Sequence, residues 1–458
     1  MRSLAVALVV LACAGSDATD SASQPVVDPC TDLTWSDFGQ PYVTTWCTPC
    51  HSASVAGVDR QGAPEGVDLD TLATVRGWKS VIAQVAVGES ATMPPVGGPT
   101  DADRTDLEEW LACDAPGVEA PEVETCTGDT VMGDLVIDGS SLPADVCAVT
   151  GSLIVRGMAP EVVALPLLQT IGGELRVEHT THLSTLALPA LRSDVKAVIF
   201  VDNPSLTAVD LGDLAAVTGD LSLSDDGIGG TLSLDRAHTI GGDLVVSGLP
   251  RLSELALWRL AGVGGALRID GVPALDQLVG TDSLRSIGGT LTIDGAGLGA
   301  VEGFTNLTAV DGIQLSRMPV VRLDAFTWLP QTGSVVLSEL PELVSTHGFH
   351  NLTAVDGPLS LTGAPIGLLD GFRQLERVGM LEIRDAQTPT LAVLAALRDV
   401  DGDLVLDGNP GLAVVTGLHG VEHVGGDLVV RSNPRLTPAD IARLVGAIDT
   451  IDGTIVLD

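Results

Sequence analysis

The pentapeptide Gly-Asp-Leu-Val-Val occupies residues 242–246 and returns unchanged at 426–430. Apolar residues alternate with other residues in it, which is the period of a β-strand with one buried face. Related segments of the form Gly-x-Leu-x-Val/Ile/Leu stand at 133–137, 173–177, 265–269, 289–293 and 402–406. The first inward residue recurs every 22 to 24 residues, at Leu221, Leu244, Leu267, Leu291, Ile313, Val335, Leu359, Leu381, Leu404 and Leu428. This spacing predicts a β-solenoid in which each repeat forms one coil.

A turn follows most of these strands and keeps the same spacing. Proline marks it at Pro204, Pro250, Pro273, Pro319, Pro341, Pro365, Pro389, Pro410 and Pro434. Asn203, Asn409 and Asn433 directly precede three of these prolines, where a side-chain amide can satisfy backbone groups of stacked turns. The heptapeptide Asn-Leu-Thr-Ala-Val-Asp-Gly occurs at 306–312 and at 351–357, two repeat lengths apart. One repeating architecture is therefore expected from about residue 126 onward.

The strand, the Asn-Pro-x-Leu turn and the Val-Gly-Gly lead into the next strand resemble the receptor L-domain type of leucine-rich repeat. The resemblance implies a repeat domain, which we assign to residues 119–458, with caps that hide the apolar faces of the end coils. The pair Cys126 and Cys147 is expected to form the first cap, and a helix from Thr437 through about Val445 the second. No catalytic triad, carboxylate pair or phosphate loop can be defended in the repeats. The sequence does not identify what the solenoid binds, which leaves a protein or a glycan as candidate ligands.

Ahead of the repeats, Cys47-Thr48-Pro49-Cys50-His51 has the form Cys-x-x-Cys-His. Two thiols at this spacing can add to the two vinyl groups of one haem, while the imidazole that follows reaches the iron. A thioredoxin-like motif does not need the histidine, and a zinc site needs further ligands, which Cys30 and Cys113 can supply in principle. The motif predicts one haem c, attached through Cys47 and Cys50, with His51 as an axial ligand.

The sixth position of a hexacoordinate iron has a single candidate ligand. Between residues 28 and 125, His51 is the only histidine and Met93 the only methionine. Met93 stands in a Pro- and Gly-rich segment at 91–99 that can hold no helix. Such a methionine is either a core filler or a thioether presented to the iron, and we expect the ligand.

The surrounding sequence resembles class I cytochrome c over about residues 28–118. The similarity lies in an expected helix ending at Trp46, a middle helix, the Met-Pro-Pro at 93–95, and a closing helix to Cys113 that begins at Thr100 or Asp101. The resemblance implies a small all-α fold, a single haem with His/Met ligation, and electron carriage. The sequence departs from the soluble respiratory carriers because it lacks their Lys-rich docking face, which leaves the redox partner open.

The N-terminus is typical of an exported bacterial protein. A basic Arg2 precedes an apolar run that is too short to span a bilayer and that ends in Val10-Leu11-Ala12-Cys13. This ending resembles the lipobox of bacterial lipoproteins, which implies a signal peptide at 1–12 and a lipid on Cys13; the alternative is an ordinary signal peptide cut near Ala14 or Gly15. Residues 13–27 are expected to form a flexible tether. We therefore expect lipid anchoring in the cell envelope, at the outer membrane.

Four cysteines remain once Cys13 carries lipid and two others carry haem, and they allow three pairings. Cys30 and Cys113 flank the haem region, while Cys126 and Cys147 bracket the start of the repeats. The two local pairings fit the expected domain boundary best. Free thiols are not expected in an oxidising compartment.

The formal charge of −37 is spread along the chain, and lysine occurs only at Lys79 and Lys196. This excludes nucleic acid as an expected partner, since that affinity depends on clustered Lys and Arg. Two hypotheses remain: an envelope electron carrier whose solenoid binds a partner or the cell surface, and a surface binding or adhesion lipoprotein whose haem is structural or sensory. Peroxidase activity is not expected, because a Met93 ligand leaves no vacant site.

Overall fold

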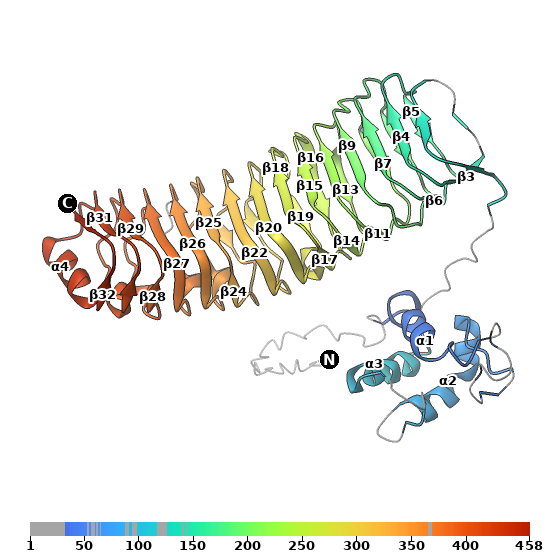
Figure 1. Cartoon of the computed structure of the whole chain (residues 1–458), viewed down its shortest axis with the longest axis horizontal. Helices are drawn as coiled ribbons and strands as arrows, with labels where there is room; N and C mark the ends of the chain where they lie inside the picture. The colour runs from blue at the N-terminus through green and yellow to red at the C-terminus, as the bar shows by residue number, and fades with distance from the viewer. Residues whose placement is uncertain are drawn as a thin grey trace, which may run out of the picture. The chain divides into compact units, whose positions relative to one another are not determined.

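The computed structural model describes residues 33–52, 55, 60, 63–64, 66–87, 91–93, 99–116, 126–139, 142–143, 145–364 and 369–458. The chain divides into two compact units, Met1–Thr125 and Cys126–Asp458 (Figure 1). Each unit has its own hydrophobic core. Within the described residues, no helix is long and apolar enough to cross a membrane.

The described part of the first unit is helical. A π-helical turn, η1 (Trp35–Gly39), leads into α1 (Gln40–Trp46), and α2 (Leu72–Ala86) and α3 (Asp101–Ala112) follow. A capping box opens α2 at Thr71 and α3 at Thr100, so that a threonine hydroxyl accepts a bond from an amide of the first turn. Of the two expected starts of the closing helix, Thr100 is thus the N-cap.

Trp110 of α3 forms the centre of the core of this unit and is fully buried. Its ring stacks on Trp35 with ring centroids 6.0 Å apart and meets Phe38 edge-on at 6.1 Å. A Cβ atom on Gly39 would lie 2.3 Å from the indole ring, so any larger residue there would displace it. The start of α1 and the end of α3 are therefore fixed against each other by a glycine–tryptophan contact.

The second unit is a β-solenoid whose strands all pair in parallel (Figure 1). The inward residues expected from the repeat lie opposite one another from Leu221 to Leu428, which confirms the predicted register. The strands that carry this motif are β2 (Leu135–Ile137), β4 (Leu153–Arg156), β7 (Leu175–Glu178), β9 (Val198–Val201), β12 (Leu221–Ser224), β15 (Leu244–Ser247), β18 (Leu267–Asp270), β20 (Ser286–Asp294), β22 (Ala309–Ser316), β25 (Val335–Ser338), β26 (Ala354–Thr362), β27 (Arg377–Arg384), β29 (Leu404–Asp407), β31 (Leu428–Arg431) and β33 (Ile455–Leu457).

Shorter strands complete the main sheet and form four small side sheets. Those of the main sheet are β11 (Ala216–Val217), β14 (Thr239–Ile240), β17 (Gly262–Val263), β24 (Gln331–Thr332), β28 (Asp399–Val400), β30 (His423–Val424) and β32 (Thr450–Ile451). The side sheets contain β1 (Asp129–Val131), β3 (Val146–Val149) and β6 (Thr170–Ile171); β5 (Val162–Ala164), β8 (Thr185–Ala187) and β10 (Ala208–Asp210); β13 (Gly229–Ser233), β16 (Arg251–Ala256) and β19 (Gln277–Val279); and β21 (Ala300–Val301) with β23 (Arg322–Leu323). This unit also contains short helical turns, η3 (Thr281–Ser283), η4 (His347–Phe349), η5 (Asp370–Phe372), η6 (Ala392–Leu394) and η7 (Thr416–Gly420).

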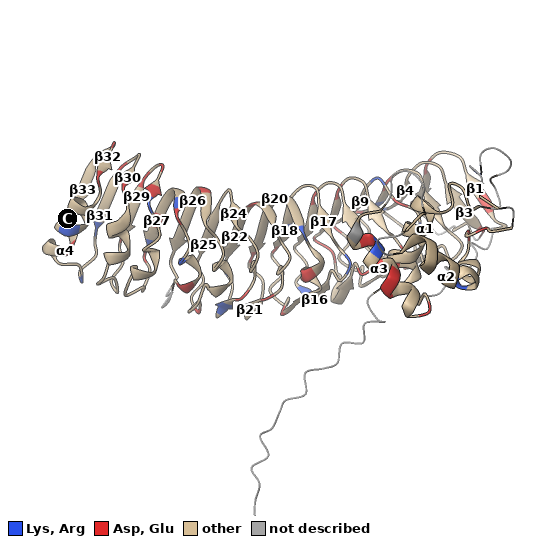
Figure 2. Cartoon of the chain, turned by 90° about the horizontal axis from the view of Figure 1, so that it is seen from below, with Lys and Arg blue, Asp and Glu red and all other residues tan. Residues whose placement is uncertain are grey.

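In the coils that carry the Gly-Asp-Leu motif, its aspartate bonds to the following coil. Asp243 donates its backbone amide to Asp220 Oδ1 at 2.8 Å, and Asp243 Oδ1 in turn accepts from Ala266 N at 2.7 Å. Asp403 and Asp427 continue the pattern, with 2.8 Å between Asp427 N and Asp403 Oδ1. Part of the acidity of the chain, whose charged residues run along the solenoid in Figure 2, is thus structural.

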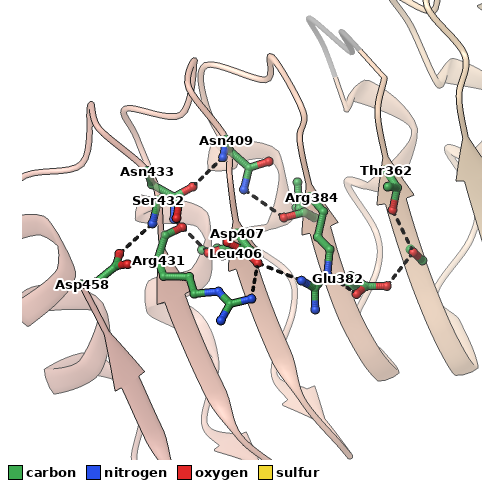
Figure 3. A network of polar contacts seen from close by, with 12 residues as sticks. Thr362, Glu382, Arg384, Leu406, Asp407, Asn409, Arg431, Ser432, Asn433 and Asp458 are labelled. Atoms are coloured by element: carbon green, nitrogen blue, oxygen red, sulfur yellow. Dashed lines mark hydrogen bonds and ion pairs between the residues drawn. The ribbon is translucent and has the colours of Figure 1, made fainter.

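Asparagine side chains link the buried turns, as the sequence predicted. Asn409 N donates to Asn433 Oδ1 at 3.1 Å, and Asn409 Nδ2 donates to the carbonyl oxygen of Ile383 at 2.9 Å. On the neighbouring strands, Asp407 accepts from both Arg384 and Arg431, at 2.8 Å each (Figure 3). Neighbouring coils are therefore joined by amide hydrogen bonds in the buried turns and by ion pairs on the outer face of the strands.

A row of phenylalanines runs through the middle of the solenoid core. Phe304, Phe326, Phe349 and Phe372 stack in order, with ring centroids 5.4, 5.2 and 5.4 Å apart, and all four are fully buried. Stacked aromatic pairs add about 0.5–1.5 kcal/mol each beyond the area they bury. The sequence analysis missed this row, although these residues recur at the repeat spacing.

Both expected caps have counterparts in the structure. Cys126 and Cys147 form a disulfide at the start of the repeats, which confirms that pairing. Helix α4 (Pro438–Ala447) begins after the N-cap Thr437. However, β32 and β33 follow α4 and pair with β30 and β31, so the helix lies within the last coil rather than after it.

Asp226 is an anomaly in the row of buried turn amides. Its Oδ1 accepts from the backbone N and the side-chain Nδ2 of Asn203, at 3.0 and 2.8 Å. Its Oδ2 is buried with no hydrogen-bond partner among the described residues. The pKa of this carboxyl is raised to about 6, chiefly by burial; the hydrogen bonds from Asn203 lower it, and the charges of Asp225 and Asp202 add to the rise. A carboxylate thus stands where Asn203, Asn409 and Asn433 place an amide.

Replacing Asp226 with Asn is expected to stabilise the solenoid at neutral pH. Because the folded-state pKa is raised, the folded chain binds more protons than the unfolded chain between about pH 4 and 6, and stability falls as pH rises through that window. One pKa unit corresponds to about 1.4 kcal/mol, so a rise from 3.8 to about 6 predicts a gain for Asp226→Asn of about 3 kcal/mol well above pH 6 and much less near pH 4. Urea unfolding at the two pH values measures this, with Asp276→Asn, at an exposed aspartate of a later coil, as the matched control. Equal midpoints at neutral pH would contradict it.

Candidate functional site

The Cys-x-x-Cys-His segment forms a tight turn that continues from α1. The helix ends at Trp46, one residue before the motif. The amides of Cys50 and His51 both donate to the carbonyl oxygen of Cys47, at 3.2 and 2.9 Å, which folds the segment back on itself. Both sulfur atoms are free thiols in the structure. The two thiols and the imidazole are thereby presented from a single turn.

A hydrogen bond fixes the tautomer of His51. Its Nδ1 lies 3.0 Å from the carbonyl oxygen of Val67, and a carbonyl oxygen can only accept, so Nδ1 carries the proton. The lone pair of the neutral ring is then on Nε2, which is the nitrogen left to bind a metal. Leu69 N also donates to His51 O at 2.7 Å and secures the backbone.

Arg60 organises the loop that carries Val67. The guanidinium is buried and donates to the carbonyl oxygens of Ser52, Pro64 and Val67, at 2.9, 2.8 and 3.2 Å. It also forms an ion pair with Asp68 at 2.9 Å, which compensates the buried charge. The carbonyl that orients His51 is therefore itself held by a buried cation.

These groups border one largely apolar cavity of about 270 Å³. The lining residues are Tyr42, Trp46, Cys47, Cys50, His51, Arg60, Ala63, Pro64, Val67, Leu69, Trp78, Val81, Ile82, Val85, Ala86 and Met93. Burial raises the pKa of the Cys47 thiol to about 12 and is also the largest cause that raises the pKa of Tyr42 to about 12. The Tyr42 hydroxyl is buried with no hydrogen-bond partner in the described part of the chain.

Met93, which follows α2 in the chain, lines the same cavity. Its backbone N donates to Val85 O at 2.9 Å, at the end of α2. Arg104 of α3 donates to the carbonyl oxygens of Ala86 and Met93, at 2.6 and 3.1 Å. The side chain is 40% exposed, so it is not a core filler packed among apolar groups. Two helices thus hold Met93 at the cavity wall.

The residues present fit a covalently bound haem. The cavity is apolar, it carries two free thiols at the required spacing, and an imidazole and a thioether both border it. The Tyr42 hydroxyl, which has no hydrogen-bond partner among the described residues, also borders this cavity and is available to a bound group. Cys47 and Cys50 would attach the group, and His51 and Met93 would be the residues available to its iron.

The remaining predicted residues have different outcomes. Cys13 and Cys30 lie outside the described residues. Cys113 is disulfide-bonded, so its thiolate is not available to a zinc ion. Cys126 and Cys147 belong to the solenoid cap and take no part in this site. Of the residues predicted to bind haem, Cys47, Cys50, His51 and Met93 all line the same cavity.

The sequence analysis missed the residues that support these side chains. Arg60, Arg104 and Tyr42 hold backbone carbonyls or border the cavity, yet none belongs to a motif. A signal was present for the two arginines, because the described cations of this unit are only Arg60, Arg76, Lys79 and Arg104. A rare cation in a loop or facing a loop is a candidate for holding carbonyl oxygens.

No protein-family model matches the chain, and no curated protein matches it. The site must therefore be interpreted from its own residues. Two thiols, one oriented imidazole and one thioether around a single apolar cavity are the observations that bear on function.

Proposed function

We propose that this protein is an envelope-anchored c-type cytochrome that carries single electrons through one haem c. Cys47 and Cys50 would attach the haem, and His51 and Met93 would bind its iron. The class I cytochrome c resemblance of residues 28–118 belongs to this proposal. So do the lipid on Cys13, the outer-membrane location and a solenoid that binds a partner or the surface.

The convergence of four side chains on one cavity is the observation that carries the proposal. Cys47, Cys50 and His51 are close in sequence, but Met93 comes more than forty residues later. Nothing in the Cys-x-x-Cys-His motif requires a methionine at the same cavity. A site for thiol–disulfide exchange needs neither the oriented imidazole nor the thioether.

Bound haem supplies a one-electron couple between ferric and ferrous iron. The chain contributes orientation and exclusion of water. The Val67 carbonyl and Arg60 keep His51 in one tautomer, while Arg104 and Val85 hold the backbone of Met93. Trp46, Trp78 and Ile82 give the cavity apolar walls. With both His51 and Met93 on the iron, no position would be left for a substrate, which favours electron transfer over substrate binding.

The test is redox behaviour of the full-length protein produced with a c-type cytochrome maturation system. Potentiometric titration should give one reversible one-electron wave, and the ferrous protein should bind carbon monoxide poorly. A ferrous protein that binds carbon monoxide readily would favour the alternative of a surface-binding lipoprotein with a sensory haem. A protein without haem under these conditions would overturn both.

A further inference from the structure

One side sheet of the solenoid is interrupted. Strands β5, β8 and β10 pair in one sheet and β13, β16 and β19 in the next, but β10 and β13 do not pair, although both are fully described. Equivalent bonds join successive coils on either side of the break: Leu165 N to Ala187 O, Leu188 N to Asp210 O, Leu234 N to Ala256 O and Leu257 N to Val279 O, at 2.8 to 3.0 Å. The bond that would stand in the middle of this series, from Leu211 N to Ser233 O, is missing.

A cleft of about 500 Å³ opens at this break, which is a volume typical of ligand sites. Its walls are residues 207–212 and 231–237, which include parts of both unpaired strands. On the opposite side of the same coils, β9, β12 and β15 pair without interruption. The coils therefore separate only locally, and two sheet edges face the cleft.

The sequence supplies a reason for the space. In each coil one residue donates its backbone amide to the carbonyl oxygen three residues earlier. In ten coils this residue is a leucine, at positions 168, 191, 214, 260, 284, 307, 329, 352, 375 and 397. Ala237 occupies this position at the break. Alanine lacks the three outer carbons of leucine, and Ala237 lines the cleft. The cleft therefore extends toward the core where the other coils are filled.

Two carboxylates and one cation are the charged groups of the cleft. Asp235 lines it, and Asp235 Oδ1 is buried with no hydrogen-bond partner among the described residues. Asp210 also lines it, while the single cation of the wall, Arg236, is paired with Asp213 at 3.4 Å. A buried acceptor without a donor is costly, so an occupant that donates to Asp235 would be favoured.

We propose that this cleft binds an extended peptide segment of a partner protein as an added β-strand. The peptide backbone bonds to the open edges, which include Leu211 N and Ser233 O, in the manner of β-augmentation. An apolar side chain enters the space beside Ala237, and a lysine or arginine of the peptide bonds to Asp235. The inference deepens the partner-binding role in the proposed function but stands on the solenoid alone.

Selection from a displayed library of random peptides tests the proposal on the full-length protein. Rounds on the wild type should enrich peptides with alternating apolar residues and at least one Lys or Arg. The matched variant is Ala237→Leu, which installs the residue of the neighbouring coils. We expect the best synthetic peptide to bind it at least about tenfold more weakly, and N-methylation of alternate peptide amides to abolish binding to the wild type.

Asp235→Asn is the second variant and decides the matter if Ala237→Leu does not fold. It keeps the shape of the side chain but removes its charge, so it should weaken the Lys- or Arg-bearing peptide without changing the unfolding midpoint appreciably. No enriched peptide, or equal binding to the wild type and the folded variants, would overturn the proposal. Haem content is unaffected by either result, so failure here is distinguishable from failure of the cytochrome assignment.

Discussion

Replacing Cys47 and Cys50 together with alanine is expected to abolish covalent haem completely. The two sulfur atoms are free thiols at the wall of one cavity, and no other cysteine among the described residues borders it. Each single variant should retain haem through one remaining thioether bond, in lower yield. The measurement is haem staining after denaturing electrophoresis of full-length protein made with a maturation system.

The matched control is replacement of Cys126 and Cys147, the disulfide of the solenoid cap. It removes the same number of sulfur atoms and should leave haem content unchanged, although loss of such a disulfide typically costs about 2–4 kcal/mol of stability. Haem that extracts from the wild type into acidified organic solvent would refute covalent attachment. Retention of haem by the Cys47/Cys50 double variant would refute these attachment sites.

Replacing Met93 with alanine is expected to lower the reduction potential by on the order of 0.1–0.3 V, within the roughly 0.8 V range that axial ligands span. A neutral thioether favours ferrous over ferric iron, so its loss stabilises the oxidised form. The sixth position should also open to water or carbon monoxide, and peroxidase activity should rise. Covalent haem content should not change, because both thiols remain.

Arg104→Gln gives a graded version of the same experiment. It leaves the thioether in place but removes the guanidinium that holds the carbonyl oxygens of Met93 and Ala86. We expect a smaller fall in potential and a carbon monoxide affinity between those of the wild type and Met93→Ala. If the potential and the ligand-binding spectrum of Met93→Ala match the wild type, Met93 is only part of the cavity wall and the electron-carrier proposal loses its main support.

The register of the solenoid was predictable because each strand carries its own signal. A period of two fixes which side chain faces the core, and the 22- to 24-residue repeat aligns one strand with the next. The last strand escaped notice because α4 lengthens the coil, so that Ile455 follows Leu428 by 27 residues. Gly453-Thr454-Ile455-Val456-Leu457 nevertheless has the repeated pattern.

The candidate site was predictable only where chemistry demands particular residue types. Cys47, Cys50, His51 and Met93 follow from ligand preferences, but the bonds that orient them do not. Val67 acts through its backbone carbonyl, which any residue possesses, and Arg60 reaches it only once the loop has folded. The cleft beside Ala237 was not predictable either. The small side chain of Ala237 is recognised as a gap only when the structure aligns it with the leucines of the other coils.

The repeated pairing of one coil with the next also means that the length of the solenoid depends on the number of coils. In the main sheet each coil pairs with its successor in the same way as with its predecessor, and the copies of Asn-Leu-Thr-Ala-Val-Asp-Gly at 306–312 and 351–357 lie two repeats apart. A whole coil can therefore be duplicated or deleted in this region without creating a new kind of interface. Because parallel strands lie about 4.8 Å apart, each such change would move the two ends of the solenoid relative to each other by a step of about that size.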